Sequence, residues 1–229
     1  MTFGGFQKTD LINFPGLVAS TVFTRGCNFR CPYCHNPEFV IQGSDQTYFG
    51  ETYTEEEILG YLKKRAGLLD GLVITGGEPT LHADLPSFIS QVKAMGLKVK
   101  LDTNGGKPDT LRELLESGML DYVAMDIKAP LDKYHLVGFN SPEAIEESVK
   151  LLNASGLDHE FRTTCVKAII SEDDFPRMAD LIGPDAKWYL QPFNPAKTLD
   201  PQYGSESTYS AAELDQIARN LHRDNTFVR

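Results

Sequence analysis

Residues 17–34 read Leu17-Val-Ala-Ser-Thr-Val-Phe-Thr24 followed by Arg25-Gly-Cys27-Asn-Phe-Arg-Cys31-Pro-Tyr-Cys34. The first part is an apolar, β-branched run with the length of a buried strand, and the second is a short loop with three cysteines. In parallel α/β folds the chemistry sits at the carboxyl ends of the strands. A cysteine loop directly after a strand therefore predicts a functional site at that point.

Similar apolar runs recur along the chain and predict five more strands. They are Leu72 to Thr75, Leu97 to Asp102, Tyr122 to Ile127, His159 to Val166 and Lys187 to Leu190. Helices are expected between most of them, with a capping box at Thr54-Glu-Glu-Glu57 ahead of Ile58 to Leu69, and further starts at Ser141-Pro142 and at Ser210 with Glu213. Glycines stand where these helices should end, at Gly96, Gly118, Gly156 and Gly183.

This alternation of about six strand-helix units predicts a parallel sheet with right-handed crossovers. A closed barrel takes eight units in about 250 residues, so 229 residues favour an incomplete TIM-like barrel. A doubly wound open sheet is the alternative that the same pattern allows. We expect one domain over 1–229, with 1–16 as an N-terminal leader and 191–229 as a C-terminal loop plus helix. The Pro-rich stretch from Gln191 to Thr208 is a candidate lid or binding segment.

Composition restricts the function classes. The chain has 22 basic and 32 acidic residues, a net charge of -10, which opposes binding to nucleic acid or to anionic membranes. There is no signal-peptide pattern and no apolar stretch long enough to span a bilayer, so a cytoplasmic protein is expected. Three of the four cysteines lie within eight residues, which is typical of metal binding and not of a disulfide framework.

Polar residues collect at the ends of the predicted strands. The list runs Thr24-Arg-Gly-Cys27, Thr75-Gly-Gly-Glu78, Asp102-Thr-Asn-Gly105, Asp126-Ile-Lys128, Arg162-Thr-Thr164 and Gln191. Charged residues are seldom buried without partners, so a purely structural explanation does not account for the whole list. Some members of the list still have a purely structural explanation. Asp102 to Asn104 can form an Asx turn, and Asp126 can form a strand-end ion pair with Lys128.

Cys27, Cys31 and Cys34 offer three thiolates where ordinary four-iron clusters take four. Three ligands leave one iron open, which is the mark of a site that does chemistry. One alternative is structural zinc with His35 as fourth ligand, but His35 is adjacent to Cys34 while zinc ligand pairs stand two to four residues apart. Another is an electron-transfer cluster that recruits Cys165, a residue expected to be inert packing because it points away from the side of its strand that carries Arg162.

The Cys-x3-Cys-x2-Cys loop with an aromatic residue before the third cysteine resembles the signature of radical S-adenosylmethionine enzymes. Gly76-Gly-Glu-Pro79 resembles that superfamily's cofactor-binding segment. A narrower resemblance, to activating proteins of the glycyl-radical group, covers nearly the whole chain. It is carried by Lys8 to Pro15, Phe23 to Pro37, Leu101 to Gly105 and Tyr122 to Pro130.

The resemblance implies a role for each matching residue. Asp102, Thr103 and Asp126 would lie near the cofactor's carboxylate and a monovalent cation, and Lys128 and Arg162 would contact the cofactor. Tyr33, Gly76, Gly77, Glu78, Asn104 and Gln191 complete the implied cofactor-binding set. The chain departs from the family with Val166-Lys-Ala where Val-Pro-Gly is common, and with Gln191 where some relatives carry histidine. The sequence leaves open whether Lys98 and Lys100 line the site or an exposed edge.

The implied function is that of an oxidoreductase of the radical S-adenosylmethionine class. Such an enzyme cleaves S-adenosylmethionine reductively at a 4Fe-4S cluster and generates a glycyl radical on a partner, here anaerobic ribonucleoside-triphosphate reductase. With only Cys165 left over, no second cluster can be built, which implies an external flavodoxin-like or ferredoxin-like electron donor. Two alternatives stay open: a small-molecule radical enzyme resembling 7-carboxy-7-deazaguanine synthase, and a non-catalytic iron-sulfur or zinc module.

Overall fold

The computed structural model describes residues 1–40 and 51–229. Contacts within the chain divide the described residues into two compact units. Unit 1 comprises Met1–Asn28, Glu38–Thr103 and Asp109–Val123, and unit 2 comprises Phe29–Pro37, Asn104–Pro108 and Ala124–Arg229. The two units are described separately below, and the single domain stays a prediction.

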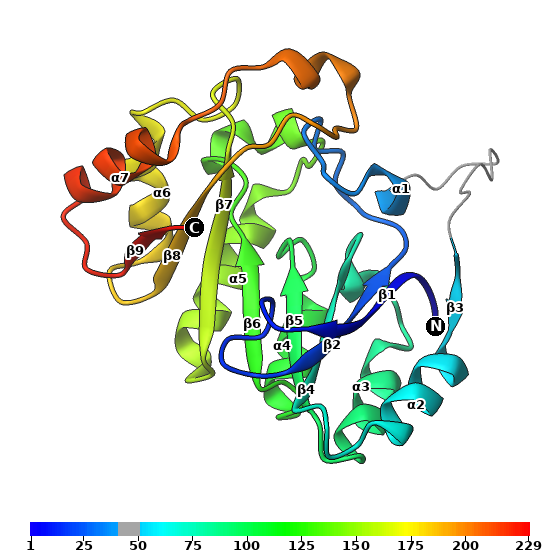
Figure 1. The fold of residues 1–229 in the computed structure, drawn as a ribbon. Coiled ribbons are helices and arrows are strands. Elements are labelled where there is room, and N and C mark those ends of the chain that lie inside the picture. The colour runs from blue at the N-terminus through cyan, green and yellow to red at the C-terminus, as the bar shows by residue number, and fades with distance from the viewer. Residues whose placement is uncertain (41–50) are drawn as a thin grey trace. The chain divides into compact units, whose positions relative to one another are not determined.

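Unit 1 is built on a mixed sheet. It contains β1 (Thr2–Asp10), β2 (Ala19–Thr24), β3 (Tyr53–Thr54), β4 (Gly71–Gly76) and β5 (Lys98–Thr103), with helices α2 (Glu55–Lys64) and α3 (Leu85–Lys93) and the 3-10 turn η1 (Pro79–Leu81). The short helix α1 (Pro37–Val40) and helix α4 (Pro108–Glu116) also belong to unit 1, except for the first residue of each, which belongs to unit 2. Strands β2, β4 and β5 are parallel, while β1 runs antiparallel to β2 and β3. Helices α2 and α3 pack against each other beside this sheet (Figure 1).

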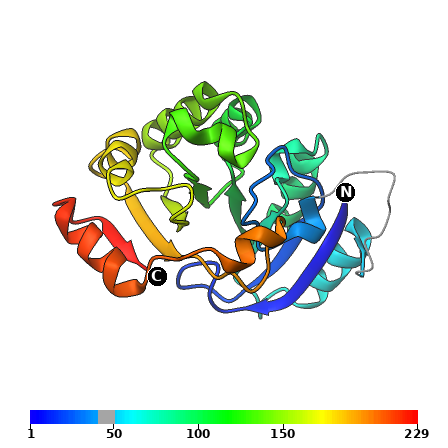
Figure 2. The same cartoon turned by 90° about the horizontal axis from the view of Figure 1, so that it is seen from above.

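Unit 2 continues the alternation of strands and helices. It contains η2 (Leu131–Val137), α5 (Pro142–Ser155), β7 (His159–Cys165), α6 (Asp174–Ile182), β8 (Lys187–Pro192), η3 (Pro201–Ser205), α7 (Ala211–Asn220) and β9 (Thr226–Val228). Strands β7, β8 and β9 are parallel. Figure 2 shows α7 and β9, in red, next to β8, against which both pack.

The strand order decides between the two predicted architectures. Strand β6 (Tyr122–Asp126) begins in unit 1 and ends in unit 2, and the order is β3-β1-β2-β4-β5-β6-β7-β8-β9. From β4 to β8 the order follows the chain without a reversal, whereas a doubly wound sheet changes direction at a switch point. The end strands β3 and β9 are not paired with each other in this order of described strands. The incomplete TIM-like barrel is thus confirmed and the doubly wound alternative is wrong.

All six predicted strands are present, and the helix signals act as expected. Thr54 caps α2 through a reciprocal capping box, in which its hydroxyl accepts from Glu57 N at 3.2 Å and Glu57 Oε2 accepts from Thr54 N at 2.7 Å. The helix ends at Lys64 and not at Leu69, because the chain turns through Gly67 at φ 90°. Residues 1–16, expected as a leader, contain β1, and residues 191–229 contain β9 besides the expected helix. No helix in the described residues has the length and apolar character to cross a membrane.

Candidate active site

Two backbone turns of unit 1 pack together immediately before Cys27. Gly77 N donates to Thr24 O at 2.9 Å, and Glu78 N donates to Gly26 O at 2.8 Å. Gly76 has φ 117°, and a Cβ atom on Gly77 would lie 2.0 Å from Gly26 O. Both glycines are therefore required by the contact between the turn after β4 and the turn after β2. This contact fixes the backbone that leads into the first cysteine, a role that the sequence did not indicate.

Glu78 ties the ends of two strands together. It is 1% exposed, and its Oε1 accepts from Thr80 N at 3.1 Å, Thr80 Oγ1 at 2.6 Å and Thr103 Oγ1 at 2.7 Å. These hydrogen bonds link the turn after β4 to the end of β5. The resemblance assigned Glu78 to the cofactor, but its carboxylate holds the local backbone. The hydroxyl proton of Thr103 is donated to this carboxylate.

Lys98 and Lys100, which the sequence could not place, have different environments. Lys98 is exposed at the start of β5, whereas Lys100 is 1% exposed. Lys100 Nζ donates to Asp102 Oδ1 at 2.7 Å and lies 5.8 Å from the centre of the Tyr122 ring. The candidate site residue Asp102 therefore has a buried cationic partner from its own strand. Their spacing of two residues, which puts both on one face of a strand, was the signal for this pair.

Backbone hydrogen bonds hold the part of the cysteine loop that lies in unit 2, both within the loop and to two other segments of the unit. Cys34 N donates to Cys31 O at 3.1 Å, Arg30 N donates to Val137 O at 2.9 Å, and Asp200 N donates to Pro32 O at 2.9 Å. Cys31 is buried and Cys34 is half-buried. The last bond comes from the predicted lid segment, whose Phe193 lies with its ring centre 6.1 Å from that of Tyr33. The stretch after β8 thus packs on the cysteine loop, which fits the expected role as a cover.

Tyr33 and His35 flank Cys34, and Tyr33 is buried while His35 is half-buried. Tyr33 is 3% exposed, and its buried hydroxyl has no hydrogen-bond partner among the described residues. Burial and the neighbouring Cys31 raise the pKa of Tyr33 well above its ordinary value, so the hydroxyl stays protonated. Burial, Lys128 and Lys197 lower the pKa of His35, which keeps the imidazole neutral. A buried hydroxyl with no partner is a place where a polar group of a bound molecule would fit.

Asp126, at the end of β6, gathers two cations within unit 2. Arg162 Nε donates to Asp126 Oδ1 at 3.0 Å, and Lys128 Nζ donates to Oδ2 at 3.2 Å. Burial raises the pKa of Asp126, but the charges of Arg162 and Lys128 outweigh it and hold this pKa below its usual value. Burial lowers the pKa of Lys128, and Asp126, Cys31, Tyr33 and Cys34 reverse that effect and raise it well above normal. The strand-end ion pair that the sequence allowed is present, and the charge of its lysine interacts with Cys31 and Cys34.

The remaining predicted residues have more local surroundings. Asn104 is 4% exposed and its Oδ1 accepts from Gly106 N at 2.8 Å, which is the Asx turn that the sequence offered as an alternative. Gln191 is half-buried at the end of β8, in register with Thr164. Burial raises the pKa of Cys165 to about 12, and its thiol donates to Thr163 O. Cys165 is fully buried, and its role as a packing residue stays a prediction.

Cys27 lies in unit 1, while Cys31 and Cys34 lie in unit 2. No group of three His, Cys, Asp or Glu side chains in the described chain is arranged to hold a single metal ion. A cluster makes a different demand, since each thiolate binds its own iron. The three cysteines as cluster ligands therefore stay a prediction.

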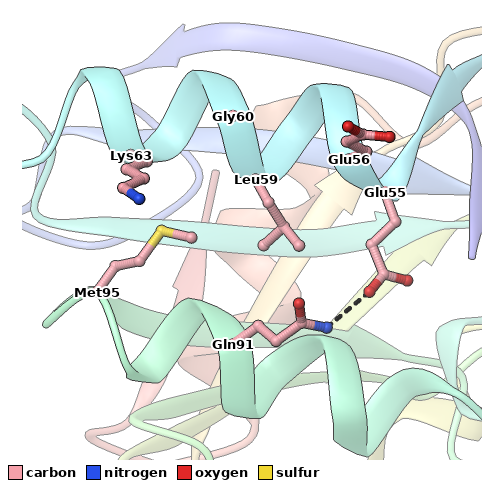
Figure 3. A pocket seen from close by; sticks show the side chains of 7 residues that line it. All are labelled: Glu55, Glu56, Leu59, Gly60, Lys63, Gln91 and Met95. Atoms are coloured by element: carbon pink, nitrogen blue, oxygen red, sulfur yellow. Dashed lines mark hydrogen bonds between the residues drawn. The ribbon is translucent and has the colours of Figure 1, made fainter.

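A pocket on the outer side of unit 1 does not belong to this site. It lies between α2 and α3, and Figure 3 shows Leu59 and Met95 facing it together with the hydrogen bond from Gln91 Nε2 to Glu55 Oε1 at 2.7 Å. None of the predicted site residues lines it. The chemistry expected from the sequence is therefore assigned to the strand ends and not to this groove.

Comparison with known proteins identifies the family. The model of the Radical SAM superfamily matches residues 21–182. A protein of Methanocaldococcus jannaschii, named as a candidate glycyl-radical enzyme activating enzyme, is 29% identical over 98% of this chain and 94% of its own length. The pyruvate formate-lyase-activating enzyme of Clostridium pasteurianum is 27% identical over 77% of this chain and 74% of its own length.

A likeness among solved structures concerns the fold alone. The crystal structure of Streptococcus suis SuiB bound to precursor peptide SuiA superposes with a TM-score of 0.68 at 14% identity. The match covers 91% of this chain and 48% of the SuiB chain, so this chain spans about half the length of SuiB. With the family model matching well over half of the chain, the chain belongs to the Radical SAM superfamily, whose members use a 4Fe-4S cluster and S-adenosylmethionine, as the resemblance predicted.

Proposed function

We propose that this chain cleaves S-adenosylmethionine reductively at a 4Fe-4S cluster held by Cys27, Cys31 and Cys34, and generates a glycyl radical on a partner enzyme. The observation that carries the proposal is the half-buried ammonium of Lys128, which donates to Asp126 Oδ2 and whose charge interacts with Cys31 and Cys34. A cluster with three thiolate ligands has a net negative charge, and a cation that interacts with its ligands favours that charge.

The residues present fit both cofactors. The partnerless hydroxyl of Tyr33 is buried next to Cys34, where a polar group of a ligand would satisfy it. Asp126 holds Lys128 and Arg162 in one place, and two cations held together favour a carboxylate such as that of the methionyl group. In unit 1, the packing of Gly76 and Gly77 against Thr24 and Gly26 fixes the approach to Cys27.

The protein's contribution is to bind and orient, and to exclude water. Bound together, the cluster and S-adenosylmethionine supply one-electron cleavage of a carbon-sulfur bond, and hence a radical able to take a hydrogen atom from glycine. Phe193 and the segment after β8 cover the cysteine loop, which limits the access of water to this part of unit 2. Asp102, Asn104 and Gln191 are proposed as further cofactor contacts on the resemblance alone.

The partner is proposed to be anaerobic ribonucleoside-triphosphate reductase. Support for a protein substrate comes from the names of the relatives in Methanocaldococcus jannaschii and Clostridium pasteurianum. Support for the reductase comes from the motifs around Phe14, Cys27 and Asp126. Because the buried Cys165 cannot serve a second cluster, we propose a flavodoxin-like or ferredoxin-like protein as electron donor. None of the four cysteines forms a disulfide in the described chain, which suits the reducing cytoplasm.

The partner is tested by electron paramagnetic resonance. The reconstituted, reduced chain is incubated anaerobically with S-adenosylmethionine and either anaerobic ribonucleotide reductase or pyruvate formate-lyase. We expect a glycyl-radical doublet on the reductase, with Cys31→Ala as the inactive control. A doublet on pyruvate formate-lyase alone would reassign the partner. Turnover of S-adenosylmethionine driven only by a small heterocycle would favour the small-molecule enzyme.

A further inference from the structure

Lys100 is a buried lysine at a position where a strand core normally has an apolar residue. Its side chain is 1% exposed, and lysine is almost never buried to this degree without a partner. The partner is Asp102, whose Oδ1 accepts from Lys100 Nζ at 2.7 Å. The aromatic ring of Tyr122, 5.8 Å from Nζ, offers a second favourable contact for the cation.

Lys100 has apolar neighbours in unit 1. Its partner across the β4–β5 ladder is Val73. Val73 belongs to a buried cluster with Phe14, Ala19 and Tyr122. Because apolar neighbours cannot solvate an ammonium group, the charge of Lys100 is stabilised mainly by Asp102, and the position of the Asp102 carboxylate is fixed in return.

This arrangement disagrees with the cation site that the resemblance implied at Asp102, Thr103 and Asp126. Asp102 is bound by Lys100, the Thr103 hydroxyl donates to Glu78, and both oxygens of Asp126 accept from Arg162 and Lys128. A metal cation is coordinated by oxygen atoms, and where these belong to carboxylates it competes with any cationic side chain already bound to them. Each carboxylate already has a cationic side chain within its own unit, so these residues do not fit the cation.

We infer that Lys100 is a built-in replacement for that cation, a positioning residue that holds the Asp102 carboxylate and makes the binding of S-adenosylmethionine independent of K⁺ and Na⁺. The binding readout rests on the proposed function. Thermal unfolding does not, and it reports on a cation site directly, because an ion that binds the native state raises the melting temperature.

The experiment compares KCl, NaCl and choline chloride at matched ionic strength. The affinity of the reconstituted enzyme for S-adenosylmethionine is measured by equilibrium dialysis, and the melting temperature is measured without S-adenosylmethionine. For the wild-type chain, we expect both quantities to be the same in all three salts. A wild-type affinity or melting temperature that rises saturably with K⁺ or Na⁺ would overturn the inference, with no variant needed.

Lys100→Met removes the charge and keeps the length of the side chain. In choline, this variant should bind S-adenosylmethionine about tenfold more weakly than in KCl, and K⁺ should raise its melting temperature. Lys98→Met, on the same strand but exposed, is the matched control and should behave as wild type. A Lys100→Met protein that ignores K⁺ in both measurements contradicts the inference. Absence of binding in every salt contradicts the proposed function, and the melting temperatures then decide the inference alone.

Discussion

Arg162 Nε lies 3.0 Å from Asp126 Oδ1, so a side chain of β7 holds the carboxylate at the end of β6. Lys128 holds the second oxygen of the same carboxylate. The three residues form a charged cluster in unit 2, and the charge of the half-buried Lys128 interacts with Cys31 and Cys34. Neutralising Asp126 would leave two partly buried cations without their common partner.

Asp126→Asn should therefore lower the free energy of unfolding by about 2 kcal/mol and weaken binding of S-adenosylmethionine. Urea unfolding of the apo-protein and equilibrium dialysis of the reconstituted protein give the two values. The matched control is Asp132→Asn. Asp132 is 57% exposed and pairs with Arg177 at the surface, so its loss should cost less than about 1 kcal/mol. Equal effects of the two substitutions would argue against the role given to Asp126.

Glu78→Gln is expected to loosen the link between the turn after β4 and the end of β5. The amide retains one oxygen, but hydrogen bonds from Thr80 and Thr103 to a neutral acceptor are weaker than those to a carboxylate. We expect a loss of about 1–3 kcal/mol in unfolding free energy, while the exposed Glu56→Gln stays near wild type. Wild-type stability of Glu78→Gln would show that the buried carboxylate does not hold these turns.

Asp10 makes the stability of unit 1 depend on pH in the acid range. Burial raises its pKa, but hydrogen bonds from Thr21, Asn13 and Ile12 outweigh it and hold the pKa below the ordinary value of 3.8. The native state therefore binds this proton more weakly than the unfolded state. The stabilisation is complete above the unfolded pKa and is lost as the pH falls through the lower native one.

Asp10→Asn should accordingly be less stable than wild type at pH 7, and the difference should shrink as the pH falls below about 4. Urea unfolding at a series of pH values measures it, with the exposed Asp158→Asn as the control that changes little. A difference that grows towards acid pH would have the wrong sign for a lowered pKa.

Cys165→Ala should retain a full cluster after reconstitution, because the native thiol is protonated and bound to a backbone carbonyl. The expected cost is about 1 kcal/mol from the lost packing. Iron and sulfide analysis with visible absorption checks the cluster, and Cys34→Ala provides the depleted reference. If Cys165→Ala loses iron to the same extent, the fourth cysteine is a ligand after all.

The central strands were predictable because β-branched runs of strand length are a local signal. Strands β1, β3 and β9 were not. Strand β1 contains Gly4 and Gly5, and its pairing with β2 has register shifts between Phe3 and Gly5 and between Gln7 and Asp10, so the alternation of apolar residues is broken. Strands β3 and β9 are two and three residues long, too short for a pattern.

The sequence could nominate members of the candidate site, but not the contacts that these residues make. The rule that polar residues at strand ends form the site selected Glu78, Asp102 and Asp126 from the sequence. Which of them bonds to which depends on how turns that are distant in sequence meet. The bonds from Thr103 to Glu78 and from Arg162 to Asp126 span 25 and 36 residues and leave no local trace.

The measurement that tests the account most directly is the formation of 5'-deoxyadenosine. The chain is reconstituted anaerobically with iron and sulfide, reduced with dithionite and supplied with S-adenosylmethionine, and the product is quantified by chromatography. We expect 5'-deoxyadenosine and methionine in equal amounts from the wild type, and neither from Cys31→Ala. A fully loaded, reduced wild-type cluster that forms no 5'-deoxyadenosine, even with the partner reductase present, would contradict the account.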